Sequence, residues 1–172
     1  MRSIYKIVVC SLLTLSITSC EKDLLEKEQY QKEIYLIGAY NRVWTTEVSY
    51  SNEEVKTYFT VSSSGTLALD RDVNVKMKIN EELVDIYNKK YWTVLNEDKY
   101  YKSLDTDLYS IPSLENTVIK HAEGISAEVP VLIKTASLKI DQSYVIPVEI
   151  ESTTGYPISE SGYKMLILLK LK

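Results

Sequence analysis

Four aromatic side chains are the residues of this sequence best suited to hold a ligand. Trp44, Trp92, Tyr100 and Tyr101 stand among polar neighbours rather than inside apolar runs. A flat ring with a polar edge can stack on the C–H face of a sugar while it stays partly in water. The plainer interpretation is that these rings complete the rim of a hydrophobic core. Tyr100 and Tyr101 are adjacent, so on a strand they would point to opposite faces and one would be a core residue.

Catalytic chemistry has few candidates. His121 is the single histidine, and nucleophilic catalysis needs a base beside the nucleophile. The sequence contains no Gly-x-Ser-x-Gly segment and no glycine-rich phosphate loop. The two carboxylates of a glycosidase come together only in the folded protein, so sequence spacing does not exclude them. A small domain nevertheless rarely provides a cleft for such a pair. We therefore expect a protein that is not an enzyme, with a hydrolase as the alternative.

Metal and cofactor sites are not expected. One histidine, with no cysteine after residue 20, leaves too few ligands for a transition metal. Asp70-x-Asp72-x-Asn74, with Glu81 further on, copies part of a calcium-binding loop. Its sixth position is Val75, where the loop needs glycine, and this excludes an EF-hand. A looser calcium site on Asp70 and Asp72 stays open as an alternative.

A candidate modification site lies at Cys20. The chain begins with Arg2 and Lys6, continues through an apolar run and reaches Ile17-Thr18-Ser19-Cys20. A cationic start, a short apolar core and small residues before a cut are typical of a secretory signal peptide. The core is too short to cross a bilayer. The ending resembles a bacterial lipobox, which predicts a signal peptide over residues 1–19 and lipid on Cys20. The alternative is an ordinary cysteine near a soluble-type cleavage site.

Residues 20–32 are mostly charged and are predicted to form a tether between the lipid anchor and a folded domain. Glu21-Lys22-Asp23 resembles an acidic signal that sends lipoproteins to the outer face of the outer membrane, and the alternative is a plain solvated linker. The chain has a formal net charge of −4. Because nucleic-acid binders show concentrated basic patches, nucleic acid is not an expected partner. Membrane attachment would come from the lipid at Cys20.

From residue 33 onward the pattern is that of β-strands. Strands are predicted at 33–39, 55–61, 73–79, 126–134, 143–151 and 163–171. Within 73–79, apolar and polar residues alternate, so Val73, Val75, Met77 and Ile79 should face the core. The strand at 163–171 is apolar on both faces, which is typical of a central strand covered on both sides, in part by the one helix predicted below.

One helix is predicted at about 81–89, where the apolar residues change to helical spacing. Its apolar stripe should pack across an open end of the β-core. Short strands, regular turns and a single helix indicate a single mainly β domain over residues 33–172. We expect an immunoglobulin-like antiparallel β-sandwich. The segment 138–145 resembles the tyrosine corner of such folds, in which the Tyr144 hydroxyl would bond to backbone upstream. The alternative is that Tyr144 is a plain core residue.

Several segments together resemble one known domain family. They are Leu69–Val75, Glu82–Asn88, the Tyr91…Leu95…Tyr100 spacing, Glu123-Gly124 and Leu138–Val148. They are similar to the N-terminal domain of unknown function found in lipoproteins of Bacteroidetes-type bacteria, over about residues 33–171. Asn96 departs from the family pattern, which commonly has proline there. In relatives this domain often precedes lectin-like or endoglycosidase domains within glycan-uptake systems.

The expected function combines the anchor with this resemblance. It is an outer-membrane, surface-exposed lipoprotein module with a non-enzymatic binding or scaffolding role in glycan capture and uptake, with the periplasmic face as the other location. The implied partners are the membrane through Cys20, a glycan ligand and an outer-membrane transport protein, and no cofactor is implied. The alternative is a structural or adhesive surface lipoprotein without glycan affinity.

Overall fold

The computed structural model describes residues 31–172, and Lys32–Lys172 forms one compact unit. The predicted signal peptide (1–19), the predicted lipidation site Cys20 and most of the predicted tether (20–32) lie outside the described residues. The described part consists of β-strands, the α-helix α3 (Glu82–Tyr91) and three 3-10 helices, which are η1 (Ala39–Asn41), η2 (Val94–Lys99) and η3 (Thr106–Leu108).

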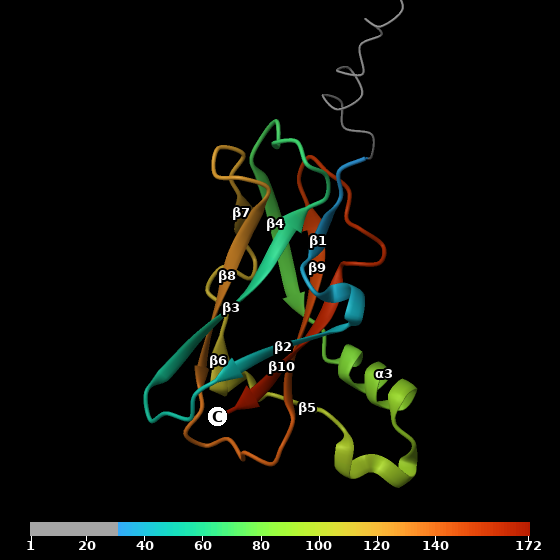
Figure 1. The fold of residues 1–172 in the computed structure, drawn as a ribbon, viewed down its shortest axis with the longest axis vertical. Coiled ribbons are helices and arrows are strands. Elements are labelled where there is room, and N and C mark those ends of the chain that lie inside the picture. Colours follow the sequence, from blue (N-terminus) through green and yellow to red (C-terminus); the bar gives the residue numbers. More distant parts are fainter. Residues whose placement is uncertain (1–30) are drawn as a thin grey trace, which may run out of the picture. The chain divides into compact units, whose positions relative to one another are not determined.

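The first sheet contains four antiparallel strands in the order β1-β3-β8-β6 (Figure 1). These strands are β1 (Ile34–Leu36), β3 (Glu54–Ser63), β8 (Ser126–Lys134) and β6 (Tyr109–Ser110). The β3–β8 pairing is the longest and runs from Glu54 opposite Lys134 to Ser62 opposite Ser126. The β3–β8 pair therefore forms the centre of this sheet, while β1 and β6 pair with only short stretches of its two edges.

The second sheet has the order β2-β10-β9-β4-β7, with β5 also paired to β9. Its strands are β2 (Val43–Val48), β10 (Lys164–Leu171), β9 (Tyr144–Thr153), β4 (Val73–Ile79), β7 (Thr117–Ile119) and β5 (Lys102–Ser103). The β2–β10 and β5–β9 pairings are parallel, and the others are antiparallel. With β1 in one sheet and β2 in the other, the chain changes sheets at Gly38, whose φ is 89°.

The two sheets pack face to face as a β-sandwich, as predicted. The orders β1-β3-β8-β6 and β10-β9-β4 correspond to the ABED and GFC sheets of an immunoglobulin-like fold. In β4, Val73, Val75 and Met77 are buried and Ile79 packs against the same core, so the predicted register is confirmed. The inward side chains of β3, β8, β9 and β10 complete this core.

The predicted tyrosine corner is present in position, but its hydrogen bond is weak. Tyr144 is the first residue of β9, and the backbone N–H of Lys139 donates to its hydroxyl oxygen at 3.5 Å. That distance is long for an N–H···O hydrogen bond, which is usually 2.7–3.2 Å. The corner therefore marks the turn into β9 and adds little energy to the fold.

The helix α3 packs on the outer face of the second sheet, where Leu83 and Val84 meet Val145 and Leu166. This confirms that the helix covers part of the strand at 163–171, and it corrects the prediction that the helix lies across an open end of the core. The physical reason is the double-faced strand β10, since its residues point alternately into the sandwich and away from it. Both faces are apolar, so the outer one needs a cover of its own, and α3 supplies it.

The predicted strands at 73–79 and 126–134 coincide with β4 and β8, and the helix is displaced by one or two residues. The prediction missed β2 and the short strands β5, β6 and β7. These are edge or two-to-three-residue strands, whose partners are distant in the sequence. Local alternation is too short there to identify a strand.

Candidate functional site

A groove of about 340 Å³ lies between α3, η1 and the start of β10. Its floor is apolar and buried, and is formed by Ala39, Leu83, Met165 and Leu166. Its rim is formed by exposed residues, Tyr40, Arg42, Ile86, Glu160, Ser161 and Lys164, and by the half-buried Tyr87 and Tyr163. Ligand sites commonly combine an apolar base with a few polar groups, at volumes of roughly 300–1,000 Å³. The groove is therefore the candidate functional site.

The first wall is the side of α3. The Asn80 side-chain carbonyl oxygen accepts a hydrogen bond from the Glu82 N–H at 3.2 Å, which satisfies a free donor at the start of the helix. Leu83 and Val84 then face the sheet. Three residues after Leu83, Ile86 lies on the flank of the helix and remains 54% exposed. The helix thus buries one stripe of side chains against the sheet, and the neighbouring stripe lines the groove.

The second wall is the tight turn between β1 and β2. Arg42 closes η1 with φ 64° and ψ −18°, a left-handed conformation. Two backbone hydrogen bonds of 2.8 Å hold it there, from the Arg42 N–H to the Ala39 carbonyl and from the Leu166 N–H to the Arg42 carbonyl. This turn directs Tyr40 outward, and its side chain is 88% exposed.

The third wall is the loop that leads into β10, with Glu160, Ser161 and Lys164. The Lys164 ammonium lies 4.7 Å from the centre of the Tyr163 ring, in a cation–π arrangement. Among the described residues, no ion pair involves Arg42, Glu160 or Lys164. The rim therefore carries two cationic groups and one carboxylate whose charges are not neutralised by neighbouring side chains.

A cluster of three tyrosine rings lies along α3 beside the groove. The Tyr87 and Tyr101 rings stack with centres 5.2 Å apart and planes at 11°, and the centre of the Tyr91 ring lies 4.4 Å from that of Tyr87. Burial, followed by the neighbouring Tyr101, raises the pKa of Tyr87 to about 12. Tyr87 thus lines the groove while its ring is packed against the other two rings of the cluster.

Asn88 fixes this cluster in place. Its amide nitrogen donates to the Tyr101 carbonyl at 2.9 Å, and its oxygen accepts from the Tyr101 N–H at 3.0 Å. Asn88 is only 4% exposed. The side chain thus pairs with backbone as a neighbouring strand would, and it ties the segment after α3 back onto the helix. A buried amide needs such partners, because unpaired polar groups in the interior are costly.

The four predicted aromatic residues lie in three different settings. Tyr101 belongs to the tyrosine cluster, and Tyr100 beside it is half-buried. Trp92 ends α3, and its indole N–H is buried with no acceptor among the described residues. Trp44 lies on β2, 38% exposed, with its ring against Gly38. None of the four lines the groove.

Sequence reasoning missed the groove residues for a clear reason. The lining comes from three segments, around residues 39–42, 83–87 and 160–166, which are far apart in the sequence. No spacing rule connects them. One usable signal was the width of the apolar stripe of the helix, which includes Ile86 as well as Leu83; the sheet covers Leu83, and Ile86 remains 54% exposed.

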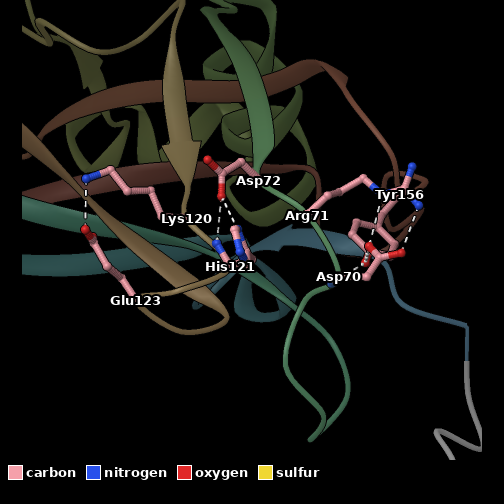
Figure 2. Close-up of polar contacts among 7 residues, drawn as sticks. All are labelled: Asp70, Arg71, Asp72, Lys120, His121, Glu123 and Tyr156. Atoms are coloured by element: carbon pink, nitrogen blue, oxygen red, sulfur yellow. Dashed lines mark hydrogen bonds and ion pairs between the residues drawn. The ribbon is translucent and has the colours of Figure 1, made fainter.

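Asp70 and Asp72 are the two residues of the alternative calcium site, and in the structure they contact different partners (Figure 2). The Asp70 carboxylate binds the Arg71 guanidinium at 2.8 Å and also accepts from the Tyr156 hydroxyl, and both contacts, Arg71 first, hold the pKa of Asp70 well below its usual range. Asp72 accepts from the His121 backbone N–H at 3.0 Å and contacts the His121 ring at 2.6 Å. The two carboxylates therefore do not converge on a common point. Within residues 31–172, no group of three His, Cys, Asp or Glu side chains could hold a metal ion.

None of the helices formed by residues 31–172 has the length and apolar character needed to cross a membrane.

Solved structures from Bacteroides share this fold. A protein of unknown function from Bacteroides ovatus aligns with a TM-score of 0.64 and 17% identity, over 83% of this chain and 46% of that one. An auxiliary nutrient binding protein from Bacteroides thetaiotaomicron aligns with a TM-score of 0.58 and 16% identity, over 78% and 44%. EndoBT-3987 of the same species, solved with a Man5GlcNAc product, aligns with a TM-score of 0.57 and 20% identity, over 80% and 30%.

The chain thus spans less than half the length of each of these structures. No curated protein matches it. A family model described as a "-like, N-terminal domain" matches residues 30–157, which is most of the chain and most of the sandwich. The chain therefore belongs to this family of N-terminal domains.

Proposed function

We propose that this protein is a non-enzymatic, lipid-anchored module of the outer-membrane surface that binds glycans for capture and uptake. The observation that carries the proposal is the groove, with its apolar floor and its exposed aromatic and polar rim. A sugar has both an apolar C–H face and a ring of hydroxyls, and such a rim offers a partner to each.

The carboxylate content of the groove favours binding over hydrolysis. Among the described residues, Glu160 is the only carboxylate in its lining. Most glycosidases use a pair of carboxylates across the scissile bond, one as acid and one as base or nucleophile. A single exposed carboxylate can accept hydrogen bonds from hydroxyls but does not supply that pair.

Two structural neighbours support a role in glycan handling. One is a nutrient binding protein, and EndoBT-3987 was solved with a glycan product. At 16% and 20% identity they share the fold with this chain, and a shared role in binding is part of our proposal. The lipid on Cys20 would hold the module at the membrane, where an outer-membrane transport protein is the proposed partner.

The test is affinity electrophoresis of the domain against a panel of host and plant polysaccharides. We expect retardation by at least one polysaccharide, and a substantial loss of it in Tyr40→Ala, because Tyr40 is 88% exposed on the rim of the groove. Tyr58→Ala is the matched control, since Tyr58 is an exposed tyrosine of β3 that does not line the groove. Equal retardation of both variants would place the ligand elsewhere. No retardation by any polysaccharide would instead favour a structural or adhesive surface protein.

A further inference from the structure

The lining of the groove carries more positive than negative charge. It contains two cationic residues, Arg42 and Lys164, and one carboxylate, Glu160. Arg42 and Lys164 make no ion pair with any described residue. The whole chain is acidic, with a net charge of −4. The groove is therefore a locally cationic place on an acidic protein.

The backbone of Arg42 is a second, independent observation. Among the described residues it is the only non-glycine residue with a positive φ. A side chain in this region is strained relative to glycine, and such positions concentrate where a site depends on them. Glycine would suit the turn better. What arginine adds there is a guanidinium, on a residue that lines the groove.

Glu160 adds an acceptor to the rim. It lies with Ser161 on the loop before β10, whereas Lys164 is the first residue of β10 and the Arg42 carbonyl accepts from the Leu166 N–H, so both cationic residues lie where β10 begins. A carboxylate accepts hydrogen bonds from sugar hydroxyls and repels a second carboxylate. The rim thus offers donors for an anionic group and acceptors for hydroxyls within one site.

We propose that the groove selects sugars that carry a carboxylate, such as hexuronic acids, over neutral sugars. The inference rests on the proposed function, in that it assumes the groove binds glycans. Arg42 would hold the sugar carboxylate through its two-pronged guanidinium, with Lys164 as a second positive charge. The exposed Tyr40 would contact the ring face, and Glu160 and Ser161 would accept from its hydroxyls.

Calorimetry with two matched probes tests the selection, namely trigalacturonate and neutral galactotriose. We expect trigalacturonate to bind about tenfold tighter or more, as charge-assisted hydrogen bonds allow. Raising salt from about 0.01 M to about 1 M shortens the Debye length from roughly 30 Å to roughly 3 Å, so the preference should shrink. Acetate added at the same concentration as the sugar carboxylate should not compete, because it lacks the ring.

Substitutions of the charged groove residues show which side chains cause the preference for trigalacturonate. Arg42→Gln and Lys164→Gln should each lose most of the preference, while Glu160→Gln should strengthen trigalacturonate binding by removing a like charge. Lys139→Gln is the matched control, because Lys139 is an exposed lysine outside the groove lining. Arg42→Gly gives a second variant at the strained position. It should melt no lower than the wild type, since glycine adopts this conformation freely, and should still lose the preference.

The outcomes separate this inference from the proposed function. Equal binding of both probes, abolished by Tyr40→Ala, would overturn the charge selection and leave glycan binding in the groove intact. A preference for trigalacturonate that survives in Arg42→Gln and Arg42→Gly would also overturn it. If neither probe binds while the polysaccharide panel shows a neutral ligand, the selection is wrong. If the panel is uniformly negative as well, the proposed function fails together with it.

Discussion

At the scale of single residues, Asn88 shows how one side chain can take the place of a strand. It closes two hydrogen bonds with the backbone of Tyr101, and through them it sets the position of the tyrosine cluster. The sequence block Leu83–Asn88 carries part of the family resemblance, yet the role of its last residue is visible only in the fold. A polar residue at the end of an apolar block is ambiguous in a sequence, because it could equally be solvated.

Replacing Asn88 with alanine should destabilise the domain by about 1–3 kcal/mol, because both backbone groups of Tyr101 lose their partner in a partly buried place. Urea denaturation monitored by tryptophan fluorescence would give the midpoint and the slope. We expect a lower midpoint with an unchanged slope. Asn96→Ala is the control, since within the described residues the Asn96 side chain bonds only the exposed Thr93 hydroxyl. Equal midpoints for the two variants would contradict the assigned role of Asn88.

At the scale of elements, the passage from β1 to β2 depends on Gly38. Its φ is 89°, and a Cβ built on it would lie 2.6 Å from the Trp44 ring. Gly38→Ala therefore meets both backbone strain and a steric clash. The strain alone costs about 1–2 kcal/mol, and displacing Trp44 adds to it.

The matched control for this change is Gly124→Ala. Gly124 also has a positive φ, 132°, but a Cβ added to it would have no neighbouring atom within 4 Å. We expect Gly38→Ala to lower the thermal midpoint more than Gly124→Ala does. Because the two positions also differ in φ, the difference between the midpoints combines the contact with Trp44 and the difference in backbone strain. If the two variants melt together, then the indole ring moves aside freely and Trp44 is not fixed by this turn.

The elements also show which parts of the structure sequence patterns can predict. β4 and β8 were found with their correct bounds, because each has a long alternation that needs no knowledge of its neighbours. β2 was missed although Val43–Val48 is rich in β-branched residues, because it is an edge strand whose partner is β10, far away in the chain. The groove was missed for the same reason, since three distant segments build it. Trp44 and Trp92 were chosen by residue type, which carries no information on distant contacts.

At the scale of the whole molecule, buried tyrosine hydroxyls predict a loss of stability at high pH. Burial raises the pKa of Tyr109 to about 12, and its hydroxyl is buried with no partner among the described residues. A tyrosine in the unfolded chain ionises near pH 10. The stability that depends on the neutral hydroxyl is fully present below about pH 10 and is lost as the pH rises from there through about 12.

Urea midpoints measured between pH 8 and pH 12 would test this. We expect Tyr109→Phe to flatten the alkaline loss, because the ionisable group is gone. At pH 7 the variant should be at least as stable as the wild type, since phenylalanine removes a buried polar atom without a partner. Tyr58→Phe, on an exposed tyrosine, should leave the profile unchanged. A Tyr109→Phe profile identical to the wild type would show that the hydroxyl is hydrated.

The proposed anchor is also a property of the whole molecule. Cys20→Ala should move the protein from the membrane fraction to the soluble fraction, because two acyl chains provide the stable attachment that a single chain does not. Cell fractionation followed by mass spectrometry of the Cys20 peptide measures both the location and the lipid. A Cys20→Ala protein that stays firmly in the membrane fraction would contradict lipid anchoring.

The parallel pairing of β2 with β10 has a consequence for how the domain folds. Val43 meets Leu166 across this pair, and β10 is also the strand that holds β9 and supports α3. The second sheet is therefore incomplete until β10, its last strand in the sequence, is available. Contacts between such distant segments have high contact order, which places refolding in the slow, millisecond-to-second range of β-sandwiches. During synthesis, β2 has no strand to pair with, and the outer face under α3 is unfinished, until β10 has left the ribosome.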